Sequence, residues 1–409
     1  VPSMVRGRIS AVFAGCLLLT LQAFAQSPPP FGKGLLALFQ MEHNLTNLNH
    51  GSYGCTPKLV QAASTVWREK MEASPDRWFR YEMYRLLDTV RRNLAEYLGV
   101  KEDDLAFVQN ASHGVNAVLR SLHVPQSSKI LYLNLAYGMV KNTLEWLHEQ
   151  SQDQLLEVNI TVPASPQSIV DSVRAALEQH KGEIYVASFS HITSIPALIL
   201  PVKELSKLCH DHGVLVLVDG AHAPGQIDVN VTDIDPDFYV GNGHKWMYSP
   251  KGSAFLWVRA DRQEMIWPTV ISLEGQGKSA FQVAFSYEGT MDMSAYLSFD
   301  AALEFRNIFG DGAIKSYLHS LAVQGGDLLC QRWNTSKLVS DDQIGGMVNV
   351  GLPVVSYPIV SNLPALLLEH YNTWVPVYPL GGVWYTRVSA QIYNDISDFS
   401  FLADAVLAL

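Results

Sequence analysis

A lysine set among glycines and aromatic residues is the first candidate for chemistry in this sequence. Lys245 lies in the stretch VGNGHKWMYSPKG, residues 240 to 252, directly after an apolar run typical of a strand. A lone lysine is normally a solvated surface residue. A lysine flanked by glycine, tryptophan and methionine at a strand end is instead a candidate for a desolvated amine with a lowered pKa. Such an amine can form a Schiff base with a carbonyl group.

A carboxylate and an imidazole accompany this lysine. Asp219 directly follows the apolar run VLVLV, and His222 comes three residues later. An isolated aspartate after a strand is more often a helix cap or a turn former. An acid, an imidazole and a Schiff-base lysine are, however, the groups that pyridoxal 5'-phosphate requires, because its ring acts as an electron sink only while its nitrogen stays protonated opposite a carboxylate. We therefore expect this cofactor, with Lys245 and Asp219 as its anchors.

The elements that must position these residues alternate between strand and helix patterns. Near-continuous apolar strands separated by helices predict an α/β fold with a parallel sheet covered on both faces. Ligands of such sheets bind at the carboxyl ends of the strands, which is where the polar clusters fall. The predicted strands are 104–109, 129–134, 183–189, 213–220, 236–243 and 252–258, and the predicted helices between them include 168–180 and 202–213.

Composition excludes several classes of protein. The 409 residues are 48% hydrophobic and 17% charged, which is enough to bury a large core and to form two domains. The 39 acidic against 29 basic residues give a net charge of −10. That sign disfavours a partner whose affinity depends on neutralising phosphates, so nucleic acid is not expected as a ligand.

The first residues have the pattern of a secretory signal. Arg6 and Arg8 precede an apolar run that ends in Ala23-Phe24-Ala25, the order of charge, apolar core and cleavage site found in such signals. We expect a signal peptide at 4–25, cleavage after Ala25, and a mature protein that is secreted or lies in the lumen of the secretory pathway, without a membrane segment. A signal anchor is the alternative, because the run approaches the lower length of a membrane span.

Cysteines and glycosylation sequons add little to the functional prediction. Cys55, Cys209 and Cys330 remain after the signal, an odd number without metal-ligand spacing, so we predict neither a disulfide framework nor a metal site. Asn-x-Ser/Thr triplets would accept glycans in a eukaryotic secretory pathway. They begin at Asn44, Asn110, Asn159, Asn230 and Asn334.

The stretch VDGAHAPGQIDV together with DFYVGNGHKWMYSPKGSAFLWVR resembles class V of the fold type I pyridoxal phosphate enzymes, in particular their isopenicillin N epimerase-like branch. The resemblance runs from about Phe31 to the C-terminus. It implies a large cofactor-binding domain at 61–295 with a mostly parallel seven-stranded sheet, and a smaller C-terminal α/β domain at 296–409. An N-terminal arm at 26–60 would contribute to the small domain and to the mouth of the active site.

The resemblance assigns a phosphate site to the turn in FVQNASHGVNAVLRSL. This segment is predicted to be a strand, a polar turn and a helix whose first amides point outward, which suits an anion. Ala111 and Ser112 match the phosphate-binding turn of the family. His113 either assists or is structural, and His244 is placed near the phosphate by the same likeness.

The resemblance also assigns residues around the cofactor ring. Tyr137 matches the aromatic residue that the family places against the ring; a core tyrosine is the alternative. Ser194 stands in SFSHITSIPALILPVKEL where the family usually has asparagine, and Pro196-Ala197 replace its Thr-Gly, which puts contacts there in doubt. His222 occupies the place that often bonds the ring hydroxyl.

Three further segments concern substrate and assembly. SYEGTMDMSAY resembles the family segment in which the Gly289-Thr290 turn reaches the phosphate of the neighbouring subunit, so a homodimer with shared sites is expected. Arg387, in WYTRVSAQIYND, supplies a planar fork suited to a substrate carboxylate. Asn49 and His50, in NLNHGSYGCTP, match a family segment close to the substrate.

The resemblance implies an enzyme acting on an L-amino acid, with Lys245 as the base that takes the α-proton. By analogy with the branch we expect a carbon–sulfur lyase that eliminates sulfur from cysteine or a cysteine sulfoxide conjugate and yields pyruvate and ammonia. Tyr137 would protonate the leaving sulfur, but it suits the second acid of an epimerase equally well. Epimerase, aminotransferase and a secreted pseudoenzyme are the alternatives. The last is disfavoured because the anchors are all present: Lys245, Asp219, Ser112, Thr290 and Arg387.

Overall fold

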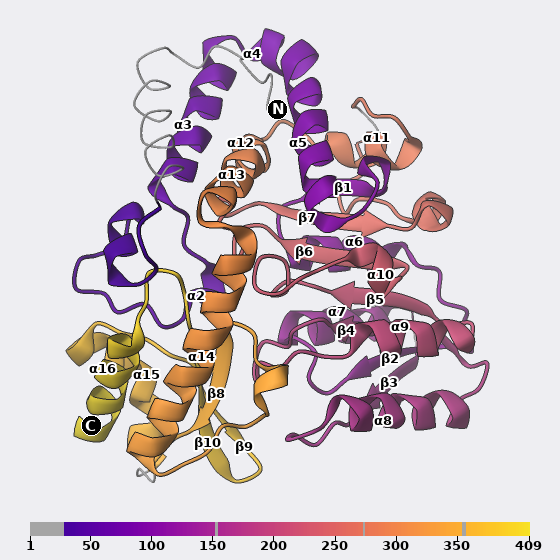
Figure 1. Cartoon of the computed structure of the whole chain (residues 1–409). Helices are drawn as coiled ribbons and strands as arrows, with labels where there is room; N and C mark the ends of the chain where they lie inside the picture. Colours follow the sequence, from indigo (N-terminus) through magenta and orange to yellow (C-terminus); the bar gives the residue numbers. More distant parts are fainter. Residues whose placement is uncertain (1–27, 152–153, 273–274, 354–356) are drawn as a thin grey trace.

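The structure of the protein is a computed structural model that describes residues 28–151, 154–272, 275–353 and 357–409. The expected signal peptide at 4–25 lies outside these residues. Two sheets with their helices, joined by one long helix, make up the described chain (Figure 1). None of the described helices combines the length and apolar character needed to cross a membrane.

The large sheet confirms the predicted α/β class. Its strands run in the order β1-β7-β6-β5-β4-β2-β3, and β2 to β6 pair in parallel, whereas β7 is antiparallel to both of its neighbours. Six of the seven strands coincide with predicted apolar runs. The bounds are Leu105–Val108 (β1), Lys129–Leu133 (β2), Gln154–Val158 (β3), Ile184–Ser190 (β4), Leu215–Asp219 (β5), Phe238–Asn242 (β6) and Ala254–Val258 (β7).

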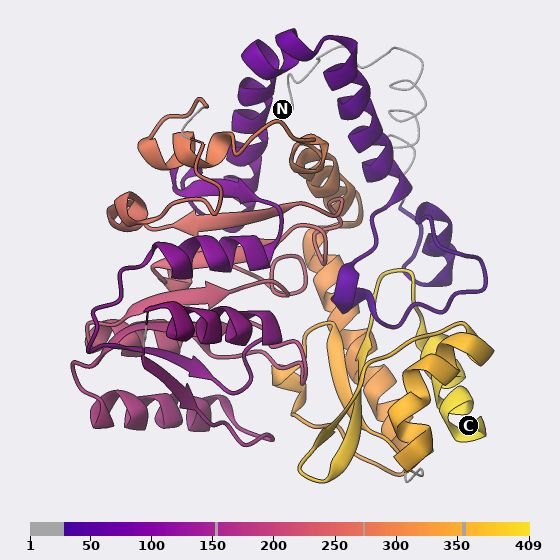
Figure 2. The same ribbon diagram turned by 180° about the vertical axis from the view of Figure 1, so that it is seen from behind.

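Helices cover both faces of this sheet, as near-continuous apolar strands require. On one face α5, α8 and α9 share a core with strand residues such as Val216 and Val218, and on the other α6, α7 and α11 share one with Leu217 and Val240 (Figures 1 and 2). The helices are Met83–Leu98 (α5), Ala111–Ser121 (α6), Gly138–Ser151 (α7), Pro166–Gln179 (α8), Val202–Asp211 (α9) and Ala280–Ser286 (α11), with the short α10 (Val231–Ile234) and η4 (Ala260–Met265) between strands.

The N-terminal segment forms an arm and a splayed pair of helices. The arm carries η1 (Lys33–Leu38) and α2 (His50–Tyr53). Beyond it α3 (Lys58–Ala73) and α5 diverge from the connection made by α4 (Pro75–Arg77) and η2 (Trp78–Glu82). Helices α12 (Ser294–Leu297) and α13 (Phe299–Phe309) pack against both (Figure 1).

The C-terminal part is a second α/β layer. Its three strands are antiparallel in the order β8-β10-β9. Helix α14 packs on β8 and β10, α15 packs against β9, and α16 packs against α14. The arm lies against it, since the Gly32 N–H donates to the Ile392 carbonyl at 2.7 Å and the Ser389 N–H to the Leu48 carbonyl at 2.7 Å. The elements are Asp311–Trp333 (α14), Asp341–Gln343 (η5), Met347–Gly351 (β8), Tyr357–Tyr371 (α15), Val377–Leu380 (β9), Val383–Ser389 (β10) and Ile396–Ala408 (α16). The predicted domain limits stay predictions; the one at 295–296 falls within α12.

Candidate active site

The carboxyl ends of three adjacent parallel strands bring the candidate residues together. Asp219 is the last residue of β5, Asn242 is the last residue of β6, and His191 directly follows β4. Parallel strands end at the same edge of a sheet, so these polar groups share one rim. Lys245 follows β6 by three residues and lies in the turn before β7.

The Lys245 amine contacts the imidazole of His222. Its Nζ lies 3.1 Å from His222 Nε2, and the indole N–H of Trp246 approaches His222 Nδ1 at 3.4 Å. Burial lowers the pKa of Lys245 to about 7, although the Asp219 carboxylate acts in the opposite direction. Burial, with a smaller contribution from Lys245, also holds the pKa of His222 well below its ordinary value. The amine and the imidazole are therefore both available in their neutral forms near pH 7.

Asp219 is buried at the bottom of this cluster. One carboxylate oxygen accepts the Ala221 N–H at 3.0 Å, and the other has no hydrogen-bond partner within the described part of the chain. Burial raises the pKa of Asp219, and the nearby Lys245 only partly offsets that effect. A buried carboxylate with a free oxygen is stable as an anion only opposite a cationic group.

Two buried residues that the sequence did not single out lie beside Asp219. His191 Nδ1 is 2.9 Å from the hydroxyl of Tyr239, and Asp219 and burial together hold the pKa of that hydroxyl far above its usual range, burial being the larger cause. Burial lowers the pKa of His191 to about 4. Tyr239 is an ordinary residue inside a strand and has no local signal. His191 directly follows β4 in the segment SFSHITSIP, so its strand-end position could have marked it as a candidate.

The predicted phosphate turn opens helix α6. Asn110 caps the helix by accepting the His113 N–H at 2.9 Å, and Asn242 accepts the Ala111 N–H at 2.8 Å. The backbone N–H and hydroxyl of Ser112 have no hydrogen-bond acceptor among the described residues, so they are the donors left for an anion at this helix start. The roles of Ala111 and Ser112 stay predictions, with Ser112 the better placed.

The two histidines assigned to the phosphate are both engaged by the protein. His113 Nε2 lies 2.7 Å from the Thr269 hydroxyl and 3.4 Å from Glu288, whose pKa burial raises to about 7. His244 donates from Nδ1 to the Ser253 carbonyl at 3.2 Å, and burial lowers its pKa to about 4. A neutral His244 therefore has only a lone pair on Nε2, and a phosphate contact would require its protonation.

Arg387 is the most heavily bonded candidate. Its guanidinium is buried and donates to the Ser194 carbonyl at 2.9 Å, to Asn49 Oδ1 at 2.7 Å and to the Ser52 hydroxyl at 2.9 Å. Its Nε has no partner among the described residues. Burial lowers the pKa of Arg387 to about 10, while Tyr378 and Tyr137 nearby act to raise it. Asn49, Ser194 and Tyr137 are thus gathered around one cation that has an unused donor.

Tyr137 and His50 differ in the solvent exposure of their side chains. Tyr137 is 50% exposed and directly precedes α7. His50 is buried, and both of its ring nitrogens contact protein groups: the Lys245 carbonyl at 3.0 Å and the Tyr393 hydroxyl at 2.9 Å. Substrate contacts by either residue stay predictions.

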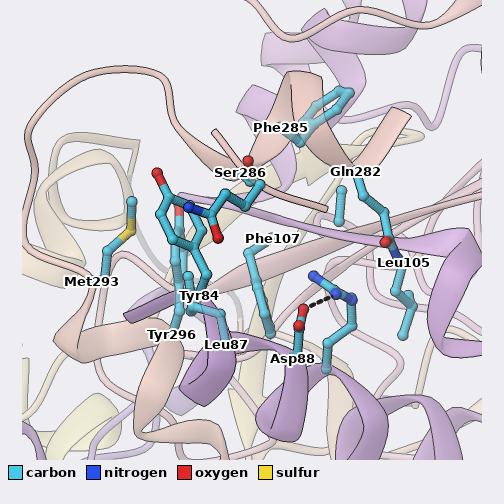
Figure 3. Close-up of a pocket in the computed structure, with 13 residues that line it drawn as sticks. Tyr84, Leu87, Asp88, Leu105, Phe107, Gln282, Phe285, Ser286, Met293 and Tyr296 are labelled. Carbon is cyan, nitrogen blue, oxygen red and sulfur yellow. Dashed lines mark hydrogen bonds and ion pairs between the residues drawn. The ribbon is translucent and has the colours of Figure 1, made fainter. Parts of the chain in front are cut away.

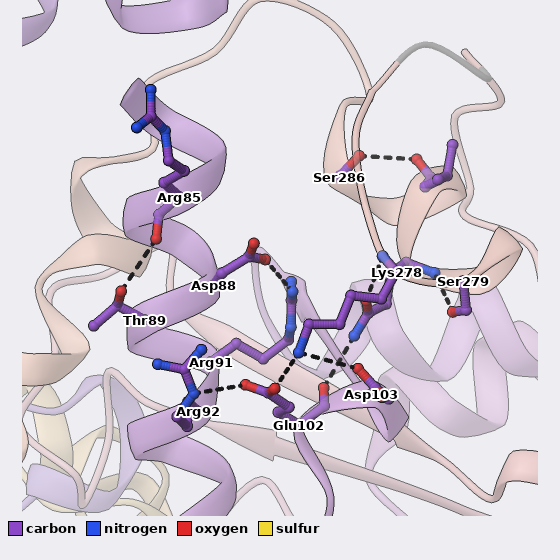
Figure 4. Close-up of polar contacts among 12 residues, drawn as sticks. Arg85, Asp88, Thr89, Arg91, Arg92, Glu102, Asp103, Lys278, Ser279 and Ser286 are labelled. Carbon is purple, nitrogen blue, oxygen red and sulfur yellow. Dashed lines mark hydrogen bonds and ion pairs between the residues drawn. The ribbon is translucent and has the colours of Figure 1, made fainter. Parts of the chain in front are cut away.

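The segment that carries Gly289 and Thr290 is anchored to the loop after α5. Lys278 forms ion pairs with Glu102 and Asp103 of η3 (Glu102–Asp104), as Figure 4 shows. Thr290 itself is exposed.

Phe107 and Tyr296 help to line a small cavity near this segment (Figure 3). Its volume of about 20 Å³ is enough for one water molecule.

These residues fit pyridoxal 5'-phosphate. Lys245 offers an amine with a lowered pKa for the aldehyde. Asp219, a buried residue, offers the ring nitrogen a carboxylate oxygen that has no hydrogen-bond partner among the described residues. Ser112 offers free donors at a helix start for the phosphate. No group of three or more His, Cys, Asp or Glu side chains among the described residues is placed to hold a metal ion.

Comparison with known proteins agrees with this fit. The family model described as aminotransferase class-V matches residues 59–362. A probable chloroplastic L-cysteine desulfhydrase of Arabidopsis thaliana is 31% identical over 399 residues, 90% of this chain and 83% of that protein. Isopenicillin N epimerase of Streptomyces clavuligerus is 31% identical over 388 residues, 90% of this chain and 96% of that protein.

A solved structure shows the fold independently. A cystine C–S lyase in complex with its product cysteine persulfide superposes with a TM-score of 0.77 at 19% identity, covering 89% of this chain and 97% of that chain. Its likeness and the sheet order confirm the fold type I architecture. By the match over 59–362 and the two relatives at 31% identity, the chain belongs to the class V aminotransferase family of pyridoxal 5'-phosphate enzymes.

Proposed function

We propose that the protein is a carbon–sulfur lyase that uses pyridoxal 5'-phosphate to eliminate the sulfur group from L-cysteine or a cysteine sulfoxide conjugate, with pyruvate and ammonia as the products. The observation that carries the proposal is the 3.1 Å contact between the Lys245 amine and His222 in a site that also holds the buried Arg387. The relative named as an L-cysteine desulfhydrase supports the choice of substrate class.

Each residue then has a task that its surroundings support. The cofactor, when bound, supplies an electron sink for the pair left by the α-proton. Lys245 holds the cofactor and, once its amine is free, accepts that proton at Nζ, because an amine with a pKa of about 7 is largely unprotonated at slightly alkaline pH. Asp219 keeps a proton on the ring nitrogen. Arg387 binds the substrate carboxylate through its charge and its Nε–H, the donor that Ser194, Asn49 and Ser52 leave unused.

Tyr137 is the proposed acid for the leaving sulfur. Its side chain is half-exposed and lies close enough to Arg387 to raise the pKa of that guanidinium, which supports a position near the substrate carboxylate. The same position would suit an acid that returns a proton to the opposite face of the substrate. Since a relative at equal identity is named isopenicillin N epimerase, epimerisation is the second candidate activity.

Assembly and location belong to the proposal as well. A homodimer would let Gly289 and Thr290 complete the site of the partner subunit, and the exposure of Thr290 supports this arrangement. Removal of residues 4–25 would release the protein into the secretory pathway. Sedimentation of the mature protein and N-terminal sequencing test these two points; a monomer in its active form, or soluble protein with Met4 intact, would refute them.

The activity test uses purified protein loaded with cofactor. Cysteine, cystine, a cysteine sulfoxide and alanine are supplied separately while pyruvate, sulfide and optical rotation are followed. Pyruvate released only from the sulfur-bearing substrates supports the lyase; loss of optical activity without pyruvate supports the epimerase. Borohydride should trap the cofactor on Lys245 in the wild type and leave Lys245→Ala colourless and without an adduct. An adduct in that variant would refute the assignment of the lysine.

A further inference from the structure

The backbone carbonyl of Lys245 is held by a side chain from the N-terminal arm. His50 Nε2 lies 3.0 Å from this oxygen, 195 residues away in sequence, and His50 Nδ1 lies 2.9 Å from the Tyr393 hydroxyl. Asn47 Nδ2 in turn lies 2.8 Å from that hydroxyl. Four groups from the arm, the lysine turn and the C-terminal part thus form one chain of hydrogen bonds.

The direction of every hydrogen bond in this chain follows from the chemistry of its ends. A carbonyl oxygen only accepts, so His50 carries its proton on Nε2 and donates it to Lys245. Burial lowers the pKa of His50 to about 3, so the ring is neutral and Nδ1 is an acceptor. The Tyr393 hydroxyl must then donate to Nδ1, and its oxygen is free to accept the Asn47 amide N–H. All groups in the chain are satisfied at once.

Packing around the chain leaves little room for other contacts. The ring of His50 is 1% exposed and lies 5.1 Å, centre to centre, from the ring of Trp246. Gly54 adopts a φ of +67°, and a Cβ there would lie 1.8 Å from the His244 carbonyl oxygen, so the arm backbone rests directly on the lysine turn. The arm therefore contacts the peptide groups on both sides of Lys245: His50 bonds the Lys245 carbonyl, and Gly54 packs on the His244 carbonyl.

We propose that His50 is a positioning residue for the cofactor lysine: with Tyr393 and Asn47 behind it, it fixes the Lys245 peptide so that Nζ reaches His222 and the cofactor. This differs from direct substrate binding by His50, which the family resemblance implies. Asn49, one residue earlier, contacts Arg387 instead. The arm thus contacts the Lys245 peptide through His50 and the Arg387 guanidinium through Asn49. The inference rests on the proposed role of Lys245 as the residue that carries the cofactor.

The test compares His50→Leu, which removes the donor, with His50→Gln, whose amide nitrogen can replace Nε2. In the holoenzyme we follow the pH midpoint of the visible absorption band and the rate of cofactor loss. If Lys245 is held less firmly, water reaches its nitrogen and stabilises the protonated form of that nitrogen. His50→Leu should therefore raise the pH midpoint of the absorption band. Cofactor should be lost about ten- to a hundredfold faster, as expected when one buried hydrogen bond is removed. His50→Gln should restore both values.

Steady-state kinetics separate positioning from substrate contact. His50→Leu should lower kcat more than it raises KM, whereas Asn49→Ala should raise KM and leave the absorption midpoint unchanged. A wild-type midpoint in His50→Leu together with a raised KM would overturn the inference and support substrate binding by His50.

A second variant guards against misfolding. If His50→Leu does not fold, Tyr393→Phe is informative by itself, because it keeps the ring that packs on Phe39 and removes the hydroxyl that donates to His50 and accepts from Asn47. A smaller rise of the midpoint is expected, and no change overturns the inference. If the wild type has no reducible adduct at Lys245, the proposed function fails; an adduct present but insensitive to these variants overturns the positioning role alone.

Discussion

The Lys245 amine and the His222 imidazole, 3.1 Å apart, form a hydrogen bond whose proton can be located. The Trp246 indole only donates, so its 3.4 Å contact makes His222 Nδ1 the acceptor. A neutral imidazole then has its proton on Nε2, and it donates that proton to the lysine nitrogen. Only an unprotonated amine can accept it, which agrees with the lowered pKa of Lys245.

The first prediction concerns stability and pH in the cofactor-free protein. The pKa of Lys245 is about 7 when folded against 10.5 for an ordinary lysine. Between these values the unfolded chain binds a proton that the folded chain does not, so this group makes the free energy of unfolding rise with pH from 7 to 10.5. Denaturant unfolding of the wild type and of Lys245→Met across this range measures the difference. If the free energy of unfolding changed with pH by the same amount in both proteins, the lowered pKa of Lys245 would be contradicted.

The second prediction concerns the acid at the end of β5. Asp219→Asn keeps an oxygen for the Ala221 N–H but cannot stabilise a proton on the ring nitrogen. We expect the variant to retain cofactor and to lose turnover by about a hundredfold or more, the range found when an acid–base group is removed. Asp228→Asn, at an exposed ion pair with Lys315, is the matched control and should be unaffected. Wild-type turnover in Asp219→Asn would refute the role.

The third prediction concerns the substrate carboxylate. Arg387→Lys keeps the charge but loses the planar fork and most of the bonds to Ser194, Asn49 and Ser52. The KM for cysteine should rise by about tenfold or more, as expected for a lost charge-assisted hydrogen bond. Cysteamine, which lacks the carboxylate, provides the control: the variant should bind it no worse than the wild type. Equal losses for both compounds would place the carboxylate elsewhere.

The sheet and the anchors at its rim could be predicted because they are local in sequence. Buried parallel strands are near-continuous apolar runs, and the residue that follows each run is at the rim wherever the strand lies in the sheet. The strand that was missed, β3, lies at the edge of the sheet, where Gln154 and Glu157 face solvent. Its apolar signal is correspondingly weak.

The partners of the anchors could not be predicted, because they depend on how distant segments meet. Asn242 accepts the Ala111 amide across 131 residues, and the Tyr393 hydroxyl lies 343 residues from His50. Each of these residues has an unremarkable local setting. Only the folded chain shows that the Ala111 N–H is taken by Asn242, whereas the Ser112 N–H has no acceptor within the part of the chain that the structure describes.

The last prediction concerns Asn110, which is both a glycosylation sequon and the cap of α6. Its side-chain oxygen accepts the His113 N–H at 2.9 Å, and Ser112, the third residue of the sequon, has the free donors of the phosphate turn. The other sequons, at Asn44, Asn159, Asn230 and Asn334, begin at exposed residues, whereas Asn110 is half-buried. A bulky glycan on Asn110 would lie beside the site proposed for the cofactor phosphate.

We therefore expect Asn110 to be bare in active protein secreted from glycosylating cells, with glycans confined to the four exposed sequons. Glycopeptide mapping of the cofactor-loaded fraction measures this directly. Asn110→Asp removes the sequon but keeps a capping oxygen, so it should leave glycan mass and cofactor content unchanged, whereas Asn110→Ala should destabilise the helix by about 1 kcal/mol. Substantial occupancy of Asn110 in the active fraction would mean that the phosphate lies elsewhere than at the start of α6, because one turn cannot hold both a glycan and the cofactor phosphate.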